Sequence, residues 1–364
     1  MSRGLVSWPA GAVRVKVPAT SANLGPGFDA LGLALALHDE VEAQVIPGGL
    51  DLHVTGEGAA EVAGAGGRHL VVRAMRTAFD DLGTGQPPGL ALRCVNRIPH
   101  GRGLGSSAAA IVAGILAARA LAGAEVAPGA ALPLASAIEG HPDNVAPCLY
   151  GGLTVAWLAA SGQARAIRLE PLAQVRPVAV IAPAPVSTEV ARGLLPTSVS
   201  HGDAAANAGR AALLVAALTT APDALLDATE DRLHQAYRAP AMPHTHDLVV
   251  RLRAAGIAAV VSGAGPSVLA FPDASAPTRV KLDSTIRETG IGWIVSPLDV
   301  ERQGASVTPD TPEHGAGSVP PALECADSRR TGSQSVAELR PLLPQHGWPR
   351  SWMAVKECRG LRWC

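Results

Sequence analysis

Residues 90–109 read LALRCVNRIPHGRGLGSSAA, and this stretch decides the fold class. From Leu90 to Ile98 apolar residues alternate with polar ones, which is the pattern of a half-buried strand. A glycine-rich loop begins at Pro99. The almost wholly apolar run Ser106–Leu121 then predicts a buried helix, with Ser106 as its N-cap and Gly123 just beyond its end. A strand, a glycine loop and a helix in this order predict backbone N–H groups that converge on a phosphate.

The loop differs from the two common nucleotide-binding patterns. It lacks the Lys-Ser or Lys-Thr ending of a P-loop, and its glycines at 101, 103 and 105 do not fit GxGxxG. Glycines alone are equally well explained by a tight turn that Ser106 caps. The loop therefore needs support from other parts of the chain before it indicates phosphate binding.

Bulk composition excludes several classes of protein. The chain has 364 residues, of which 48% are hydrophobic, so it is long enough to bury a core in two domains. Its 30 basic and 31 acidic residues nearly cancel, which argues against nucleic acid or an anionic membrane as a partner. No apolar run approaches the roughly 20 residues that span a bilayer. Five widely spaced cysteines without a CxxC pair predict neither disulfides nor zinc, and they favour a cytoplasmic location.

The chain divides into three parts by composition. Short β-like runs alternate with Ala- and Leu-rich stretches from Val13 to Phe271, which favours mixed α and β layers. A Pro-punctuated segment at 171–185 suggests a boundary, so we expect domains at 1–170 and 171–305. Residues 306–364 are rich in Pro, Gly, Ser and charge without apolar periodicity, and they are predicted to be a disordered tail.

Three motifs together resemble the GHMP kinases. Pro99-x-Gly-x-Gly-Leu-Gly-Ser-Ser-Ala-Ala109 resembles the ATP-binding motif of that superfamily. Val17–Asp29, VPATSANLGPGFD, resembles the first motif, and Val261–Val268, VSGAGPSV, resembles the third. They occur in the family's order, and the resemblance covers residues 13 to about 300. It implies an α+β fold with an N-terminal αβ domain that carries the ATP loop and a C-terminal ferredoxin-like αβ domain.

The resemblance also implies ATP and Mg²⁺ as cofactors. The residues expected to contact ATP are Pro99, His100, Gly101, Arg102, Gly103, Leu104, Gly105, Ser106, Ser107, Ala108 and Ala109. Arg102 is unusual among them, since its side chain either contacts ATP or points to solvent. The hydroxyl of Ser107 and the carboxylate of Glu139 are expected to hold Mg²⁺, because hard oxygen ligands suit this ion.

The string Glu139–Val145, EGHPDNV, resembles the form found in the homoserine kinase branch of the family. It adds Asp143 and Asn144 to Ser107 and Glu139 as implied catalytic residues. Asp143 either orients the attacking hydroxyl or accepts its proton, and we expect positioning to be its main role.

An amino acid substrate needs cations for its carboxylate, and arginine offers a bidentate contact. Ser187–Arg192 and Tyr237–Pro240 resemble the segments that supply these contacts in the family. A carboxylate such as Asp29 suits an ammonium group. The residues implied to contact substrate are Asn23, Asp29, His141, Asp143, Thr188, Arg192, Arg238 and Gly265.

The function that follows from the resemblance is phosphorylation of the L-homoserine hydroxyl to O-phospho-L-homoserine, a step of threonine biosynthesis, by a homodimer. One alternative is a GHMP kinase for another small alcohol such as mevalonate. Another is a non-catalytic ligand-binding protein on the same scaffold. The pair of arginines with Asp29 favours a zwitterionic substrate, and the Ser107 and Glu139 pair favours catalysis. His244 and His246 are interpreted as the start of a helix and not as metal ligands.

Overall fold

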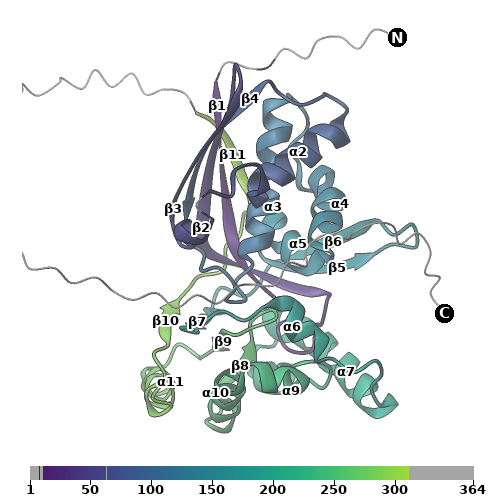
Figure 1. The fold of residues 1–364 in the computed structure, drawn as a ribbon. Coiled ribbons are helices and arrows are strands. Elements are labelled where there is room, and N and C mark those ends of the chain that lie inside the picture. The colour runs from purple at the N-terminus through teal and green to yellow at the C-terminus, as the bar shows by residue number, and fades with distance from the viewer. Residues whose placement is uncertain (1–7, 9–10, 63, 311–364) are drawn as a thin grey trace, which may run out of the picture. The chain divides into compact units, whose positions relative to one another are not determined.

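The structure of the chain is a computed structural model, and it describes residues 8, 11–62 and 64–310. Residues 1–313 form one compact unit, whereas 314–364 form a second unit that lies outside the described residues. The sequence predicts a disordered tail, and the residues of this tail from 311 onward lie outside the described part of the structure. Figure 1 shows two sheets in the described unit, each with its own helices.

The first sheet has seven strands in the order β11-β1-β2-β4-β3, and β5 pairs with both β2 and β6. Neighbouring strands are antiparallel except β3 and β4, which run parallel. Inward-facing apolar positions of these strands, such as Val15 and Val17, are fully buried. The strand bounds are β1 Ala12–Ala22, β2 Leu31–Ile46, β3 Gly49–Gly56, β4 Gly89–Asn96, β5 Leu153–Leu158, β6 Ala164–Leu169 and β11 Ser306–Asp310.

Helices cover one face of this sheet (Figure 1). They are α1 Ala59–Val62, α2 Leu70–Leu82, α3 Ser106–Leu121, α4 Pro128–Glu139 and α5 Pro142–Tyr150, with the short 3-10 helix η1 Gly66–Arg68 before α2. The predicted helix Ser106–Leu121 is confirmed at both ends, and its Ala, Ile, Val and Leu side chains are buried almost all around. Its N-cap is Gly105 and not Ser106, because the chain enters the helix through a left-handed glycine with φ 71°.

The second sheet is antiparallel, with the order β10-β7-β9-β8. Numbered along the chain, its strands lie in the order 4-1-3-2, and helices fill the first and third connections. This is the ferredoxin-like split arrangement that the resemblance implies. The elements are β7 Val178–Ile181, α6 Thr188–Gly193, α7 His201–Thr219, η2 Pro222–Ala224, α8 Leu225–Ala228, α9 Gln235–Arg238, η3 Ala239–Ala241, α10 Pro243–Ala254, β8 Ala258–Val261, β9 Val268–Phe271, α11 Ala276–Glu288 and β10 Ile294–Pro297.

One boundary expected from the sequence needs correction. Residues 306–310 were expected in the tail, yet they form β11, which pairs with β1 from Ala12 to Lys16. The chain returns to the first sheet after the second one is complete, and Ala305 donates a backbone hydrogen bond to Cys148 on the way. A five-residue strand that contains Ser, Thr and Pro has little local strand signal, so its pairing with β1 is what makes it a strand.

The three motif loops contact one another where the two sheets meet. The Ser262 hydroxyl lies 2.7 Å from the carbonyl oxygen of Gly103 and 2.8 Å from the Ser21 hydroxyl. A carbonyl only accepts, so Ser262 donates to Gly103 and accepts from Ser21. The Gly263 backbone N–H also donates to the Ala22 carbonyl at 3.1 Å. The first, second and third motifs therefore form one hydrogen-bonded junction.

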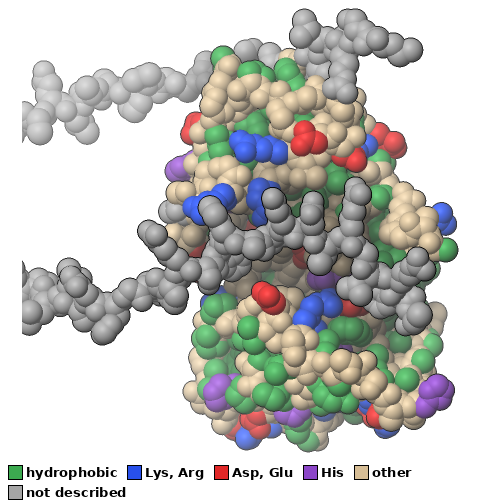
Figure 2. Space-filling model, turned by 45° about the vertical axis from the view of Figure 1, so that its right-hand side comes forward, with side chains coloured by type: hydrophobic (Ala, Val, Ile, Leu, Met, Phe, Trp, Pro, Cys, Tyr) green, Lys and Arg blue, Asp and Glu red, His purple; other side chains and the backbone are tan. Residues whose placement is uncertain are grey.

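The described surface carries mixed charge. Figure 2 shows Lys and Arg side chains interspersed with Asp and Glu on the face it presents. Within the residues that the structure describes, no helix is long and apolar enough to cross a membrane.

We predict that Gly103→Ala lowers the free energy of unfolding more than Gly123→Ala does. Both glycines have positive φ, 73° and 66°, where a residue with a Cβ costs roughly 1–2 kcal/mol. A Cβ at Gly103 would also lie 2.2 Å from the Ser262 carbonyl oxygen, whereas one at Gly123 meets nothing within 4 Å. This steric clash is expected to lower the free energy of unfolding by a further ~1–3 kcal/mol. Chemical denaturation measures both, and equal losses would show that the junction tolerates a methyl group.

Candidate active site

The glycine loop ends at the N-terminus of α3, where backbone N–H groups lack intrahelical partners. Gly101, Gly103 and Gly105 have φ of 64°, 73° and 71°, which side chains rarely adopt. Arg102 does not point to solvent alone, because it donates hydrogen bonds to the carbonyls of His100, Ala182 and Pro183 at 2.7, 3.0 and 2.9 Å. Its side chain thus ties the loop to the segment after β7.

Two cavities flank the loop and share Ser106 and Ser107. The first, of about 150 Å³, brings together most of the predicted site residues with two that were not predicted, Gly263 and Ala264. The predicted residues that line it are Asn23, Gly101, Gly103, Gly105, Ser106, Ser107, Glu139, His141, Asp143, Asn144, Thr188, Arg192 and Arg238. The second, of about 240 Å³, is mainly apolar, with Val17, Asp39, Val41, Val62, His69, Leu70, Val71, Asn96, His100, Ala109, Ala110 and Ala113 beside the shared serines.

Ser107 and Glu139 form a polar pair beside the glycine loop. Ser107 lies in the first turn of α3 and Glu139 ends α4, and the Ser107 hydroxyl donates to Glu139 Oε2 at 2.8 Å. Burial raises the pKa of the Glu139 carboxyl above its ordinary value, against the hydrogen bond from Ser107, which lowers it. A hydroxyl and a carboxylate at this distance are a donor set that suits Mg²⁺ together with phosphate oxygens. Among the described residues, no group of three or more His, Cys, Asp or Glu side chains is arranged to hold a metal ion.

His141, Asp143 and Asn144 come from the start of α5. Asp143 is 1% exposed and its Oδ1 is hydrogen-bonded to His141 Nδ1. Burial acts to lower the pKa of His141, but the hydrogen bond and charge of Asp143 outweigh it and raise that pKa above its ordinary value. The Thr20 hydroxyl donates to Asn144 Oδ1 at 2.9 Å, which orients the Asn144 amide. Three polar side chains are thereby held in fixed positions next to Glu139.

Two arginines, Arg192 and Arg238, also line the first cavity. Arg192 forms a two-point contact with Asp29, at 3.2 and 2.7 Å. Arg238 is 1% exposed, and its Nη1 donates to the Gly263 carbonyl at 3.3 Å. The Phe28 ring lies 5.7 Å from the Arg192 guanidinium carbon and 5.5 Å from that of Arg238. The aromatic ring offers both cations a favourable contact within the same corner of the cavity.

The remaining predicted substrate residues lie around this corner. Asn23 is 4% exposed and its amide is hydrogen-bonded at both ends, since Nδ2 donates to the Gly263 carbonyl and Oδ1 accepts from the Asp29 backbone, each at 2.9 Å. Thr188 lines the cavity from the first turn of α6. Gly265 does not line it, although its neighbours Gly263 and Ala264 do. Asp29 likewise reaches the cavity through its contact with Arg192 and is not itself part of the lining.

Not every residue of the predicted ATP loop faces a cavity. His100 and Ala109 line the second cavity. Leu104 and Ala108 are buried in the hydrophobic core, where they hold the loop against the sheet. Pro99 lines neither cavity.

The sequence gives no local motif for the walls of the second cavity. Beyond the glycine loop and α3, they come from β1, β2, α1, α2 and β4, so no short segment outside the loop and α3 contains more than a few of them. Val17 and Val41 are inward-facing strand positions that look like ordinary core residues. The one usable signal is their place on strands that pack beside the glycine loop.

Comparison with known proteins agrees with this geometry. The family model of the GHMP kinases N terminal domain matches residues 69–152, and that of the GHMP kinases C terminal domain matches residues 211–283. A homoserine kinase from Streptomyces coelicolor is 58% identical over 303 residues, which are 82% of this chain and 96% of the relative. The chain belongs to the homoserine kinases of the GHMP kinase family.

Other homoserine kinases are similar along the same part of the chain. The one from Clavibacter michiganensis is 50% identical over 81% of this chain and 93% of its own length. A crystal structure of homoserine kinase from Cytophaga hutchinsonii matches with a TM-score of 0.71 and 28% identity, and covers 84% of this chain and 100% of the other. The resemblance seen in the three motifs and the two-domain fold class are confirmed.

The family matches also bear on where the homoserine kinase site lies. The N-terminal match contains the glycine loop, Glu139 and Asp143, and the C-terminal match contains Arg238 and Val261–Val268.

Proposed function

We propose that the chain transfers the γ-phosphoryl group of ATP to the side-chain hydroxyl of L-homoserine and releases O-phospho-L-homoserine, on the route to threonine. The observation that carries this proposal is the first cavity itself. It is lined both by the glycine loop with Ser107 and Glu139 and by Arg192 and Arg238. Groups suited to phosphate chemistry and groups suited to carboxylate recognition therefore border a single cavity.

The nucleotide would occupy both cavities across the loop. The second cavity offers apolar walls from Val17, Val41 and Leu70 for a nucleoside. The phosphates would pass along the loop, where backbone N–H groups and the α3 N-terminus favour negative charge. Ser106 and Ser107 border both cavities, so they mark the crossing point.

Ser107 and Glu139 would hold the Mg²⁺ that accompanies the nucleotide. When bound, Mg²⁺ neutralises charge that develops on the phosphates. The protein's part is to present the hydroxyl and the carboxylate at a fixed separation, which their 2.8 Å contact supports. The raised pKa that burial gives Glu139 means that this carboxyl gains from a cation beside it.

Asp143 and Asn144 would position the acceptor hydroxyl. Asp143 is buried and is hydrogen-bonded by His141, so its carboxylate is held rigidly. Such rigidity favours in-line placement of the hydroxyl, and most of the rate gain in phosphoryl transfer comes from positioning and charge stabilisation. The amino acid end would lie at Arg192 and Arg238 for the carboxylate and at Asp29 for the ammonium group.

Two further expectations belong to this proposal. We propose a cytoplasmic location, supported by Cys94 and Cys148, which are free and buried in the described core. A homodimer is expected from the family resemblance.

A coupled ADP-release assay tests the reaction across homoserine, mevalonate, galactose and shikimate. ADP release that depends on homoserine and exceeds that with the other three alcohols is the expected result. Release that is fastest with mevalonate would overturn the substrate, and release with none of them would overturn the proposed activity.

We predict that Ser107→Ala and Glu139→Gln each lower kcat by a factor that corresponds to about 3–4 kcal/mol, because each removes one oxygen donor that stabilises the transition state. The thermal midpoint should change little, since neither side chain packs in the core. The measurement is turnover at saturating ATP and Mg²⁺. Glu288→Gln, an exposed change at the end of α11, is the matched control. A kcat close to that of the control would remove these residues from the metal site.

We predict that Arg192→Ala and Arg238→Ala raise KM for homoserine far more than KM for ATP. Loss of a desolvated charged partner costs about 2–5 kcal/mol, and the carboxylate they would hold does not react. Steady-state kinetics with each substrate varied in turn gives both constants. Arg251→Ala on the exposed face of α10 should leave both unchanged. Equal increases for the two substrates would mean that these arginines serve ATP or the fold.

A further inference from the structure

His234 is a fully buried histidine next to the arginine corner of the cavity. It directly precedes α9, the helix that ends at Arg238, and its side chain is 0% exposed. Its Nε2 lies 2.8 Å from the Gly25 carbonyl oxygen, and its Nδ1 lies 3.1 Å from Arg238 Nη1. A carbonyl only accepts and a guanidinium only donates. The two contacts therefore require a neutral imidazole with its hydrogen on Nε2 and a lone pair on Nδ1.

The surroundings of His234 agree with that neutral form. Burial lowers the pKa of His234 and the charge of Arg238 acts in the same direction, whereas Asp231 and Asp29 oppose them. The carboxylate of Asp231 is occupied by the backbone, because it accepts from the N–H groups of Leu233, His234 and Gln235 at 3.0, 3.1 and 2.7 Å. It lies 3.7 Å from Nε2, farther than the Gly25 carbonyl. The Nε2 hydrogen is thus directed to Gly25.

Arg238 has few other contacts that fix its position. Its Nη1 is shared between His234 and the Gly263 carbonyl, and the latter distance is 3.3 Å. Its Nε is buried and has no hydrogen-bond partner among the described residues. Phe28 lies beneath the guanidinium and also packs on the His234 ring, with centroids 5.2 Å apart. Without the His234 lone pair, Arg238 would keep one long hydrogen bond and an aromatic face.

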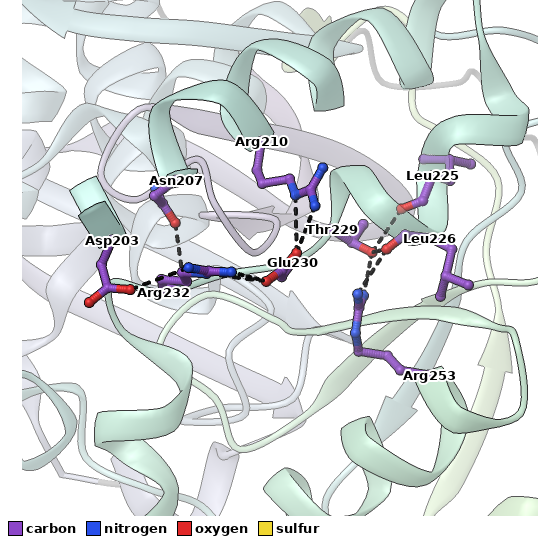
Figure 3. Close-up of polar contacts among 9 residues, drawn as sticks. All are labelled: Asp203, Asn207, Arg210, Leu225, Leu226, Thr229, Glu230, Arg232 and Arg253. Atoms are coloured by element: carbon purple, nitrogen blue, oxygen red, sulfur yellow. Dashed lines mark hydrogen bonds and ion pairs between the residues drawn. The ribbon is translucent and has the colours of Figure 1, made fainter. Parts of the chain in front are cut away.

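The segment that carries His234 is itself anchored to α7. Figure 3 shows Glu230 accepting hydrogen bonds from Arg210 and Arg232, at 2.9 and 3.1 Å. Asn207 accepts from the Arg232 backbone and donates to the Pro26 carbonyl at 2.8 Å, so one buried amide joins this segment to the first motif loop. Arg253 holds Thr229 from α10 at 2.6 Å (Figure 3). The position of His234 relative to Gly25 is therefore fixed from several sides.

We propose that His234 is a positioning residue for substrate recognition: through the lone pair on Nδ1 it holds Arg238 in the orientation that receives the substrate carboxylate. The inference rests on the proposed function, since it assigns Arg238 to that carboxylate. It adds a residue that lines neither of the two cavities beside the glycine loop and that acts only through its neighbour.

Two substitutions separate the two nitrogen atoms of His234. His234→Asn keeps an acceptor near the Nδ1 position and loses the donor toward Gly25. His234→Gln keeps a donor near the Nε2 position and loses the acceptor for Arg238. We expect KM for homoserine to rise by on the order of tenfold or more in His234→Gln and by only about two- to threefold in His234→Asn, because a hydrogen bond to a charged group is the stronger one. KM for ATP should stay unchanged in both.

A double-mutant comparison tests whether the effect passes through Arg238. In an Arg238→Ala background, adding His234→Gln should not raise KM for homoserine further, since the residue it positions is gone. Gln235→Ala is the matched control: it removes a 2.6 Å hydrogen bond to the Val261 backbone from the same short helix. That variant should lose stability and keep KM for homoserine within about twofold, as expected for a purely structural contact.

The outcomes separate this inference from the proposed function. Wild-type protein without homoserine-dependent ADP release would overturn the function, and with it the inference. An active wild type in which the two His234 variants raise KM equally would overturn the inference alone, as would additive effects with Arg238→Ala. Should both variants fail to fold, ¹⁵N NMR of the wild-type imidazole decides. A neutral ring with hydrogen on Nε2 supports the inference, whereas a charged ring or one with hydrogen on Nδ1 contradicts it.

Discussion

The hydrogen bond from Ser262 to the Gly103 carbonyl is the contact on which the site depends, because it joins the two sheets at the glycine loop. Ser21 completes it from the first strand, and the side chains of Ser21 and Ser262 are both fully buried. Buried hydrogen bonds of this kind cost free energy when a partner is lost, so the loops are held in one arrangement. As a consequence, residues that are far apart in the chain line one cavity, although no single helix or strand supplies them all.

The first motif loop shows how that junction supports unfavourable backbone. Asn23, Leu24 and Asp29 all have positive φ, at 66°, 50° and 53°. Asn and Asp tolerate this region, but leucine does so at a cost. The side chain of Leu24 is fully buried and the Asn23 amide is hydrogen-bonded at both ends, so the surroundings compensate. Backbone strain of this type persists where the surrounding contacts compensate for it. Here the strained backbone directs Asp29 toward Arg192.

Local signals in the sequence were enough for the glycine loop, α3 and the motif residues, since each depends on a short segment. The strand β11 was missed because its five residues acquire strand structure from β1 and not from their own pattern. Most of the predicted site residues line one cavity, but the sequence did not reveal the pairing of Asp29 with Arg192 or the walls of the second cavity. His234 was missed for the same reason: its partner Gly25 lies 209 positions away, and a lone histidine has no periodic signal. Contacts between distant segments are what a single sequence shows least.

The pairing of Asp29 with Arg192 affects which ions can compete for the site. A lone anion gains Arg192 only by separating it from Asp29, and a lone cation faces the reverse exchange. In either case one ion pair replaces another, and partly exposed pairs of this kind are worth little, about 0–1 kcal/mol. A molecule with both charges satisfies the two side chains at once and leaves neither unpaired. At this pair the site therefore favours a molecule that carries both charges over an ion of one charge.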